Sequence, residues 1–433
     1  MNTEERQVIR ELAKQFREQA ELPVMEERRK LWFEHNDLKT TKPVIAVFPE
    51  NAWHEIIKAE DLECEDELAR KMEWLLRARL FRSRVIQDDV PAEKIWEVKK
   101  QITDTGWDAQ NPGHKNQLFA NETYCDSNLG NCPTVWKKGF VFSGNARHFS
   151  PVIHEYKDLK RIQTPEIVYH EKETLEEFKI QQDVLGDILN VQLTGESHIN
   201  CGLLLVYTEL RGLQEVYSDI YDEPEMLREA MEIICQGFHS LLDQYAGMGL
   251  LEINNRQGYN GSGGMSYTHD LPREPGGSKN LKNHWGFTES QEFCVVGPKQ
   301  HYEFVQRYEA TFAKRFGLIS YGCCEPLEDK LTPVLEFPNI RRISVSPWAD
   351  IKKCASQIGK KAVYSWKVNP SYFINNFHQR TFFESMIKNM LEDTKDNCTE
   401  IILKDTGTCQ NDPERFGEFV SLCRRLCGEV EHS

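Results

Sequence analysis

Hydrophobic and polar residues recur along the chain with the periods of helices and strands. Near the N-terminus, Val8, Leu12 and Phe16 recur every four residues with charged residues between them, which predicts helices within residues 1–40. The run Pro43–Phe48 is apolar and is followed by a Pro-Glu-Asn turn, which predicts a first strand that ends there. The pattern therefore begins with a helical extension and continues into a strand.

From about residue 170 the pattern alternates between helical and strand segments. Together with an earlier helix, the predicted helices are 66–86, 175–189, 223–247, 301–315, 349–358, 373–391 and 413–427. The predicted strands in this region are 250–254, 317–321, 342–345, 362–366 and 400–403. Such alternation implies a parallel sheet with crossover helices.

The number of strands approaches eight when the N-terminal strands, Pro43–Phe48 and a candidate at residues 135–142, are added, which favours a closed barrel over an open sheet. We therefore predict an α/β fold, a (β/α)8 TIM barrel over residues 41–433 that follows the N-terminal helical extension, residues 1–40. Residues 100–135 are rich in Asn, Gly, Asp and Pro, which predicts an irregular insertion in this barrel.

Length and charge exclude several classes of protein. The 433 residues suffice for one large barrel domain, and the net charge of −15 with scattered Lys and Arg would repel a phosphate backbone, so we expect no nucleic-acid partner. The longest apolar runs, such as Gly202–Tyr207, are far shorter than the roughly 20 residues of a membrane span. Because the N-terminus also lacks a secretory signal, we expect a cytoplasmic protein with no membrane partner.

The thirteen cysteines are odd in number and irregularly spaced, which does not suggest a disulfide framework. In barrels of this kind, chemistry lies at the carboxyl ends of the strands. The polar or aromatic residues that follow the predicted strands are Glu50, Asn51, His54, Glu252, Asn254, Asn255, Cys323, Cys324, Glu325, Ser346, Trp348, Trp366, Asn369, Asp405, Thr406 and Cys409.

Two thiol sites, Cys323 with Cys324 and then Cys409, thus fall on the same predicted face. Thiolates with one nitrogen or oxygen ligand suit a catalytic Zn²⁺ that keeps one position open for substrate. The alternative is that all three cysteines are core thiols at the rim of the barrel. The Gly-rich stretch from Gln257 to Gly277 matches no phosphate-binding motif, and its composition predicts a mobile lid over the mouth.

Five blocks in the second half of the chain, over about a third of its length, resemble one family in order and spacing. They are Trp285–Phe293, His301–Arg315, Ser320–Cys324, Trp366–Pro370 and Thr406–Pro413. The third lies where the uroporphyrinogen decarboxylase superfamily carries a His-x-Cys motif, and the fourth is similar to its Gly-Asn-x-Asp-Pro turn. The fifth resembles the Gly-Cys segment of the zinc-dependent corrinoid and coenzyme M methyltransferases of that superfamily.

The resemblance to these methyltransferases implies Zn²⁺ held by Cys323 and Cys409, with Cys324 as a further candidate. It also implies methyl transfer from a small methylated molecule to a thiol or to a corrinoid on a separate partner protein. Tyr321 stands where the family has its ligand histidine. A third ligand must then come from Cys324, Glu252, Glu325, His198 or His269, or the site has lost its metal.

Decarboxylation of a porphyrinogen is disfavoured by the residues after the first strand. The family binds the substrate carboxylates there with an Arg-Gln-Ala-Gly-Arg motif, whereas this chain has Glu50 and Glu55 within Phe48–Glu55. Acidic side chains in place of arginines would repel the propionates.

The position of other residues at the predicted barrel mouth suggests further roles. Glu252 is a candidate ligand or general acid/base, and His54 a candidate acid for the leaving group, with a structural histidine as the alternative. Candidate substrate-binding residues, for which packing is the alternative, are Trp53, Trp285, Trp348, Trp366 and Asn369.

Two other functions stay open at this point. One is a metal-free lyase or decarboxylase acting on a different carboxylate, and the other is a non-catalytic ligand-binding barrel with a degenerate site. The N-terminal helices could form a homodimer, cap the barrel or dock a corrinoid domain.

Overall fold

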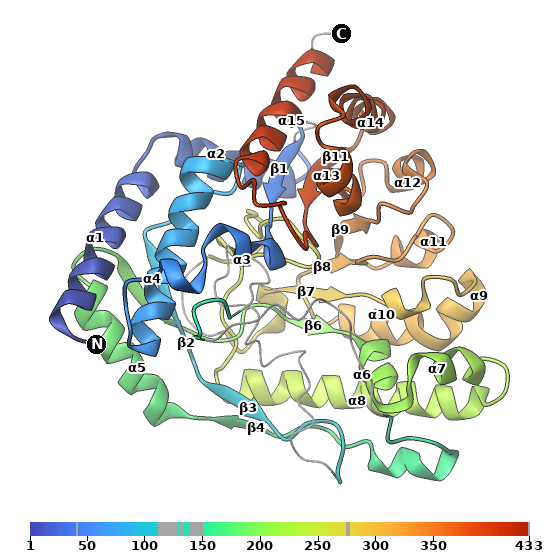
Figure 1. Ribbon diagram of the computed structural model, residues 1–433. Coiled ribbons are helices and arrows are strands. Elements are labelled where there is room, and N and C mark those ends of the chain that lie inside the picture. The colour runs from blue at the N-terminus through green and yellow to red at the C-terminus, as the bar shows by residue number, and fades with distance from the viewer. Residues whose placement is uncertain (40–41, 111–128, 130–133, 139–150, 274–277, 432–433) are drawn as a thin grey trace.

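The computed structural model describes residues 1–39, 42–110, 129, 134–138, 151–273 and 278–431 (Figure 1). The strands are β1 (Val44–Val47), β2 (Ile95–Lys99), β3 (Ile102–Asp104), β4 (Ile167–Tyr169), β5 (Asn190–Thr194), β6 (Asn200–Cys201), β7 (Trp285–Thr288), β8 (Leu318–Tyr321), β9 (Ile340–Val345), β10 (Val363–Lys367) and β11 (Cys398–Leu403). The α-helices are α1 (Thr3–Ala20), α2 (Val24–Asn36), α3 (Trp53–Ile56), α4 (Glu67–Phe81), α5 (Glu171–Leu185), α6 (Leu203–Arg211), α7 (Leu213–Asp219), α8 (Pro224–Gly247), α9 (Pro298–His301), α10 (Arg307–Ala313), α11 (Leu331–Val334), α12 (Ile351–Ile358), α13 (Pro370–Asn376), α14 (Arg380–Asp393) and α15 (Arg415–Glu431).

Seven parallel strands form the main sheet, in the order β1-β11-β10-β9-β8-β7-β6. Helices α6 to α15 lie around the outside of this sheet (Figure 1). Separately, β2 pairs with β5 in parallel and β3 pairs with β4 in antiparallel fashion. The predicted α/β class and the predicted parallel sheet are therefore confirmed.

The closed eight-stranded barrel predicted from the sequence is not found among the described residues, because the seven-stranded ladder has two open edges. At one edge, the predicted strand around Leu251 makes only an isolated bridge with Glu196. The side chain of Asn254 donates to the carbonyls of Ser197 and Trp285 at 2.8 and 2.9 Å and accepts from the Trp285 amide. A side-chain amide thus takes the place of main-chain pairing at this edge.

The other edge of the sheet is covered by two aspartates. The amides of Ile45 and Val47 in β1 donate to the carboxylates of Asp89 and Asp88, each at 2.8 Å. Side chains that bond to exposed strand amides prevent another strand from pairing there. Both edges of the main sheet are therefore occupied by side chains.

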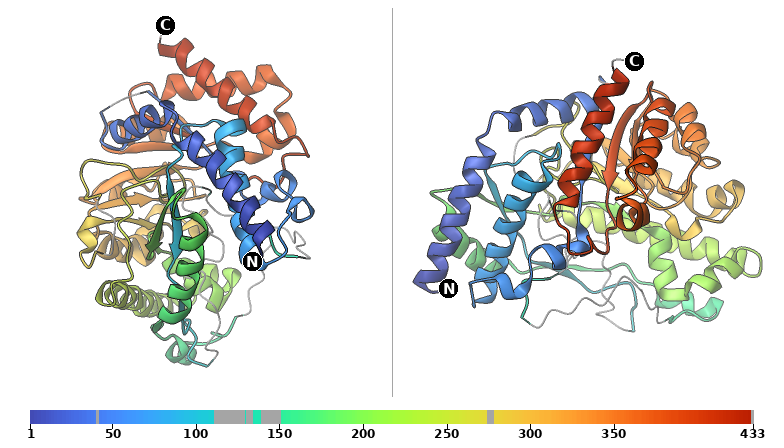
Figure 2. Two further views of the ribbon diagram at one scale, coloured as in Figure 1. Left: turned by 90° about the vertical axis from the view of Figure 1, so that its left-hand side faces the viewer. Right: turned by 45° about the horizontal axis from the view of Figure 1, so that its top comes forward.

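The helices predicted within residues 1–40 are confirmed as α1 and α2. A capping box between Asn2 and Glu5 begins α1, which packs on α4 and α5 on one side of the molecule (Figure 2). No helix in the described ranges is long and apolar enough to cross a membrane. The predicted domain division stays a prediction, and most of the predicted insertion, residues 100–135, lies outside the described residues.

Candidate functional site

Polar side chains gather at the carboxyl ends of β1, β8, β10 and β11. In α/β folds this end of a parallel sheet is where ligands bind. Lys367 ends β10, Lys404 follows β11, and the two strands pair in register with Lys367 opposite Ile402. We call the following residues the strand-end cluster: Glu50, His198, Tyr259, Cys323, Lys367, Lys404 and Asp405.

The two lysines of the cluster are buried but differ in charge. Lys404 donates to the Tyr259 hydroxyl at 3.5 Å and lies 3.6 Å from the Asp405 carboxylate. Although burial opposes the charged form, the acidic neighbours, Asp405 first, hold the pKa of Lys404 well above its ordinary value. Burial, together with repulsion from Lys404 and Arg342, outweighs the attraction of Glu400 and lowers the pKa of Lys367 to about 7. A lysine that is partly neutral at physiological pH can act as a base or nucleophile.

Glu50 and Asp405 both have left-handed backbones, with φ of +49° and +57°. Non-glycine residues hold this conformation only where their surroundings enforce it, and such residues concentrate at functional sites. The Asp405 amide donates to Glu50 Oε2 at 3.0 Å, while the buried Oε1 has no hydrogen-bond partner among the described residues. Burial outweighs the nearby Lys404 and raises the pKa of Glu50 to about 8. Glu50 is therefore mainly a neutral acid at pH 7.

His198 adds a neutral ring to the cluster. Its imidazole lies beside the ring of Tyr259, with centroids 5.9 Å apart. Burial, with the positive charges of Lys99 and Lys404, lowers the pKa of His198 to about 4. The cluster thus contains a neutral imidazole, a neutral carboxylic acid and at least one ammonium group.

The Gly-rich segment predicted as a lid is instead buried against the sheet over residues 257–267, whereas 274–277 lie outside the described residues. A Cβ at Gly264 would lie 2.7 Å from Glu400 Oε2, and one at Gly263 would lie 2.7 Å from the Ile402 side chain. Both glycines also have positive φ. Glycine is therefore needed here for close approach to the strands rather than for flexibility.

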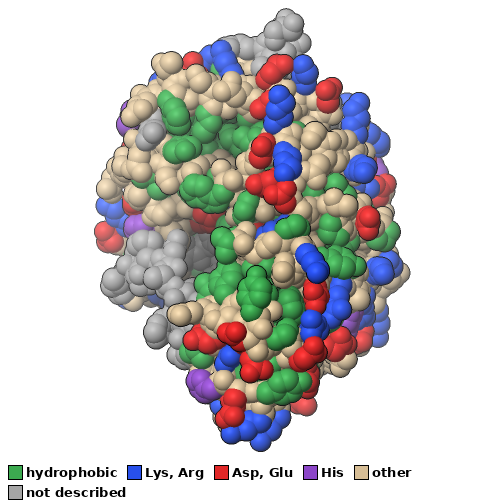
Figure 3. Space-filling model, turned by 90° about the vertical axis from the view of Figure 1, so that its right-hand side faces the viewer, with side chains coloured by type: hydrophobic (Ala, Val, Ile, Leu, Met, Phe, Trp, Pro, Cys, Tyr) green, Lys and Arg blue, Asp and Glu red, His purple; other side chains and the backbone are tan. Residues whose placement is uncertain are grey.

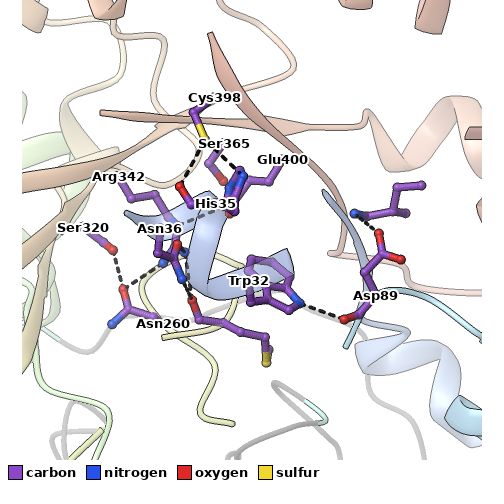
Figure 4. A network of polar contacts seen from close by, with 12 residues as sticks. Trp32, His35, Asn36, Asp89, Asn260, Ser320, Arg342, Ser365, Cys398 and Glu400 are labelled. Atoms are coloured by element: carbon purple, nitrogen blue, oxygen red, sulfur yellow. Dashed lines mark hydrogen bonds and ion pairs between the residues drawn. The ribbon is translucent and has the colours of Figure 1, made fainter. Parts of the chain in front are cut away.

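Beneath the cluster, α2 reaches the buried Glu400 (Figure 4). His35 Nε2 lies 3.3 Å from Glu400 Oε2, and Arg342 Nε lies 3.1 Å from Oε1. Arg342 also donates to the Asn36 side chain at 2.7 Å and to that of Asn260 at 3.3 Å. This network holds Asn260 of the Gly-rich segment and pairs the Glu400 carboxylate with Arg342 and His35.

The predicted thiol pair lies at the end of β8, in the cluster. Cys323 Sγ is 3.6 Å from Cys324 Sγ and 3.5 Å from Ser262 Oγ. The Cys323 amide donates to Glu325 at 2.8 Å, so this predicted ligand carboxylate supports the main chain instead. Contact with Cys324 and burial raise the pKa of the Cys323 thiol well above its ordinary value.

Tyr321, at the position of the family's ligand histidine, does not join the cluster. Its hydroxyl donates at 2.8 Å to Glu309, a buried residue of α10 that also accepts from Thr288 and Ser290. Burial outweighs these hydrogen bonds and raises the pKa of Glu309 to about 7. This network supports the ends of β7 and β8 from the helix side.

Cys409, the other predicted zinc ligand, has a different partner. Its Sγ donates to the Glu55 carboxylate at 3.1 Å, and burial together with Glu55 raises its pKa to about 12. Over the described part of the chain, no three His, Cys, Asp or Glu side chains are placed to hold a metal ion together. The thiols do not fit a zinc ion in this arrangement, so we derive no step through a metal, and the zinc stays a prediction.

The two predicted catalytic residues have other close contacts. Glu252 is 2% exposed, accepts from the Gly195 amide at 3.3 Å and lies 3.7 Å from Arg256. His54 contacts the Asn51 carbonyl through Nδ1. Their catalytic roles stay predictions, and Glu50 is the acid that the structure brings to the lysines.

The predicted substrate-binding residues are not brought together. Trp53 packs on Trp74 in α4, Trp285 lies under the Arg342 guanidinium, and Trp366 is in the main core. Trp348 is 67% exposed, and Asn369 caps α13 through the Ser371 amide. Of the other ligand candidates, His269 is exposed and hydrogen-bonds Asp37. These roles also stay predictions.

Lys367 and Lys404 were missed by the sequence analysis. A usable signal was present, because Ser365 and Lys367 occupy alternate positions of an otherwise apolar strand and so face the same side. Alternation of this kind predicts that both polar side chains point to one face of a buried sheet.

Comparisons with known proteins add little to this geometry. No protein-family model and no curated protein sequence matches the chain. Among solved structures, a methyltransferase from Methanosarcina mazei is similar at 10% sequence identity, covering 93% of this chain and 99% of that one, with a TM-score of 0.45. Since a similarity this low supports no conclusion about fold or function, the proposals below rest on the chain's own residues.

Proposed function

We propose that the chain is an enzyme that transfers a methyl group between a small methylated molecule and a thiol or a corrinoid carried by a partner protein. One observation carries the proposal. The two sequence blocks that resemble methyltransferases, Ser320–Cys324 and Thr406–Pro413, lie at the carboxyl ends of β8 and β11, two strands of one parallel sheet with β9 and β10 between them. Glu50 and Lys404 lie at the same carboxyl end of the sheet. The two blocks therefore share that end with ionisable side chains suited to acid catalysis.

In this proposal Glu50 takes the acid role that the sequence suggested for His54. When the methyl group moves, the bond from carbon to the donor heteroatom breaks and its electron pair stays on the heteroatom, while the acceptor supplies the pair for the new bond. The heteroatom then takes a proton. Glu50 can donate it because its pKa is about 8 and its Oε1 has no hydrogen-bond partner within the described residues.

Zinc is a separate part of the proposal and rests on the sequence resemblance. Elemental analysis of the purified protein tests it, with about one zinc per chain expected, as in other catalytic zinc sites. Metal that is lost in both Cys323→Ala and Cys409→Ala would support the assignment, whereas unchanged metal in both variants would contradict it.

Methyl transfer is tested by following the absorbance change of free cob(I)alamin as it is methylated by methyl ethers, thioethers and methylamines. We expect Glu50→Gln to slow transfer by about 10²-fold or more, because loss of a general acid has this effect. Glu73→Gln, a change to a buried carboxylate of α4 outside the cluster, is the control and should leave the rate unchanged. If no methylated compound reacts with cobalamin or with a thiol, with or without added zinc, the proposal fails.

Lys367 favours a second candidate, a metal-free lyase or decarboxylase acting on a carboxylate. A neutral lysine beside the permanently charged Lys404 is an arrangement known to activate an amine. Metal-independent turnover of a carboxylate that is abolished in Lys367→Met would favour this reaction over methyl transfer. Stabilisation by a ligand without any turnover would instead favour the ligand-binding alternative.

A further inference from the structure

Among the described residues, no buried carboxylate is bonded to either of the two buried amines of the strand-end cluster. Lys367 and Lys404 are 4% and 7% exposed, and both lie on the side of the sheet that the Gly-rich segment covers. Lys367 donates to Ser365, and the carboxylate bonded by Lys404 belongs to Asp405, which is 48% exposed. Glu400, the buried acid that attracts Lys367, is engaged by Arg342 and His35, and the buried Glu50 is mainly neutral.

Basic side chains elsewhere are paired differently. On the face shown in Figure 3, Lys and Arg lie close to Asp and Glu. Lys353, for example, pairs with Asp329, and Arg228 pairs with Glu303. Such surface pairs stay hydrated, whereas a buried ammonium without a buried counter-charge is costly. In the described part of the cluster, Lys404 therefore has only the half-exposed Asp405 carboxylate as an ion-pair partner, and Lys367 is bonded only to Ser365.

We infer that the strand-end cluster binds the carboxylate of a small substrate, with Lys404 as its main ionic partner and Lys367 as a second donor. This inference rests on the proposed function, because it names the substrate class that the same site takes. Lys367 and Lys404 lie on adjacent strands two residues apart in register, so their Cα atoms are about 8 Å apart. Two flexible side chains at this spacing can converge on one carboxylate.

The charges favour a carboxylate over a phosphate. With Lys367 protonated, the two lysines carry two positive charges against the single negative charge of Asp405, so the cluster balances a monoanion but not a dianion. No arginine side chain of the described residues supplies a bidentate fork in the cluster, since Arg342 is engaged below it. A carboxylate on Lys404 would also bring the rest of a small molecule toward the Glu50 carboxyl, whose buried Oε1 has no hydrogen-bond partner within the described ranges.

The test compares methoxyacetate, which joins a methyl ether to a carboxylate, with its neutral analogue methoxyacetamide. Binding to the full-length protein is measured by isothermal titration calorimetry without corrinoid or thiol. We expect the acid to bind at least about tenfold more tightly than the amide, and Lys404→Met to remove that difference, because a hydrogen bond to a charged group contributes this much. Lys404→Arg should retain it, and Lys353→Met, at a surface lysine, is the matched control.

Equal binding of acid and amide, no binding of the acid, or wild-type affinity of Lys404→Met for the acid would each overturn the inference. Stronger binding of inorganic phosphate than of methoxyacetate would overturn the carboxylate assignment. Thermal unfolding of each variant shows whether it is folded, and Lys367→Met, expected to weaken binding of the acid alone, provides a second variant. The binding assay contains no acceptor and so does not depend on methyl transfer. Charge-dependent binding, together with no transfer in the separate assay with cobalamin or a thiol, would refute the proposed function and leave this inference standing.

Discussion

Glu400 is the carboxylate on which the buried charges beneath the cluster depend, and we predict that Glu400→Gln destabilises the protein by about 3–5 kcal/mol. Its two oxygens lie 3.1 Å from Arg342 Nε and 3.3 Å from His35 Nε2, and all three side chains are at most 2% exposed. Glutamine keeps the size of the side chain but leaves two buried cations without a counter-charge. The expected loss is therefore that of a broken buried ion pair rather than of a cavity.

The loss should also depend on pH, through His35. Although burial opposes its charged form, contacts with Cys398 and Glu400 raise the pKa of His35 to about 9. A group whose pKa is raised on folding stabilises the protein fully below its unfolded pKa, about 6.5, and this stabilisation is lost as pH rises toward 9. Arg342 and His35 lower the pKa of Glu400 to about 2 despite its burial, so its own contribution is present above about 4.5 and is lost below that.

Urea unfolding followed by circular dichroism at several values between pH 6 and pH 9 measures both effects. The wild type should lose stability as pH rises over this range, whereas Glu400→Gln should lose less, because His35 no longer has its carboxylate. Glu392→Gln is the control, since Glu392 is 66% exposed and its pair with Lys395 is on the surface. A change below about 1 kcal/mol in Glu400→Gln, or an unaltered pH dependence, would refute this account of the network.

Three further predictions concern the packing and protonation of the same region. Gly264→Ala should destabilise the protein by about 1–3 kcal/mol in urea unfolding, because its Cβ would lie 2.7 Å from Glu400 in a backbone with φ of +88°; Gly247→Ala, which meets nothing within 4 Å, should not. Asn254→Ala should cost about 2–3 kcal/mol, because the carbonyls of Ser197 and Trp285 lose their donor, and an unchanged unfolding midpoint would count against its role at the sheet edge. If Glu50 is the acid in methyl transfer, the rate should fall as pH rises through about 8, and this limb should be absent from the pH profile of Glu50→Gln.

Regular periodicity made many of the elements predictable from the sequence. The predicted helix 223–247 is α8, and the predicted strands at Pro43–Phe48 and 400–403 lie within or around β1 and β11. The strand β7 was missed, although Trp285–Thr288 begins one of the five blocks that resemble the family. The strands β2 and β5 were missed although polar and apolar residues alternate in both, as Glu97 and Lys99 do with Trp96 and Val98 in β2.

Tertiary contacts account for the features that composition misrepresented. Glycine content suggested a mobile lid, but Gly263 and Gly264 are placed against strand side chains that are distant in sequence. At one edge of the sheet, the Asn254 side chain hydrogen-bonds the main chain of Trp285 in place of a paired strand. Hydrophobic periodicity contains no signal that would predict such a side-chain contact. Counting predicted strands therefore could not show that the ladder of the described residues stays open.

In the candidate site, the sequence predicted where some side chains lie but not whether they are protonated. The predicted strand ends placed Glu50 and Cys323 at the same carboxyl end of the sheet, where both lie, because parallel strands have their carboxyl ends together. The roles of these groups depend on neighbours that no local motif contains: burial beside Asp405 keeps Glu50 a neutral acid, and burial beside Lys404 makes Lys367 a partly neutral amine. The left-handed backbones of Glu50 and Asp405, two acidic neighbours of Lys404, are energetically unfavourable for non-glycine residues. Backbone strain and shifted pKa values thus occur together at the carboxyl end of the sheet. This is the physical reason for placing the chemistry there rather than at the separated tryptophans.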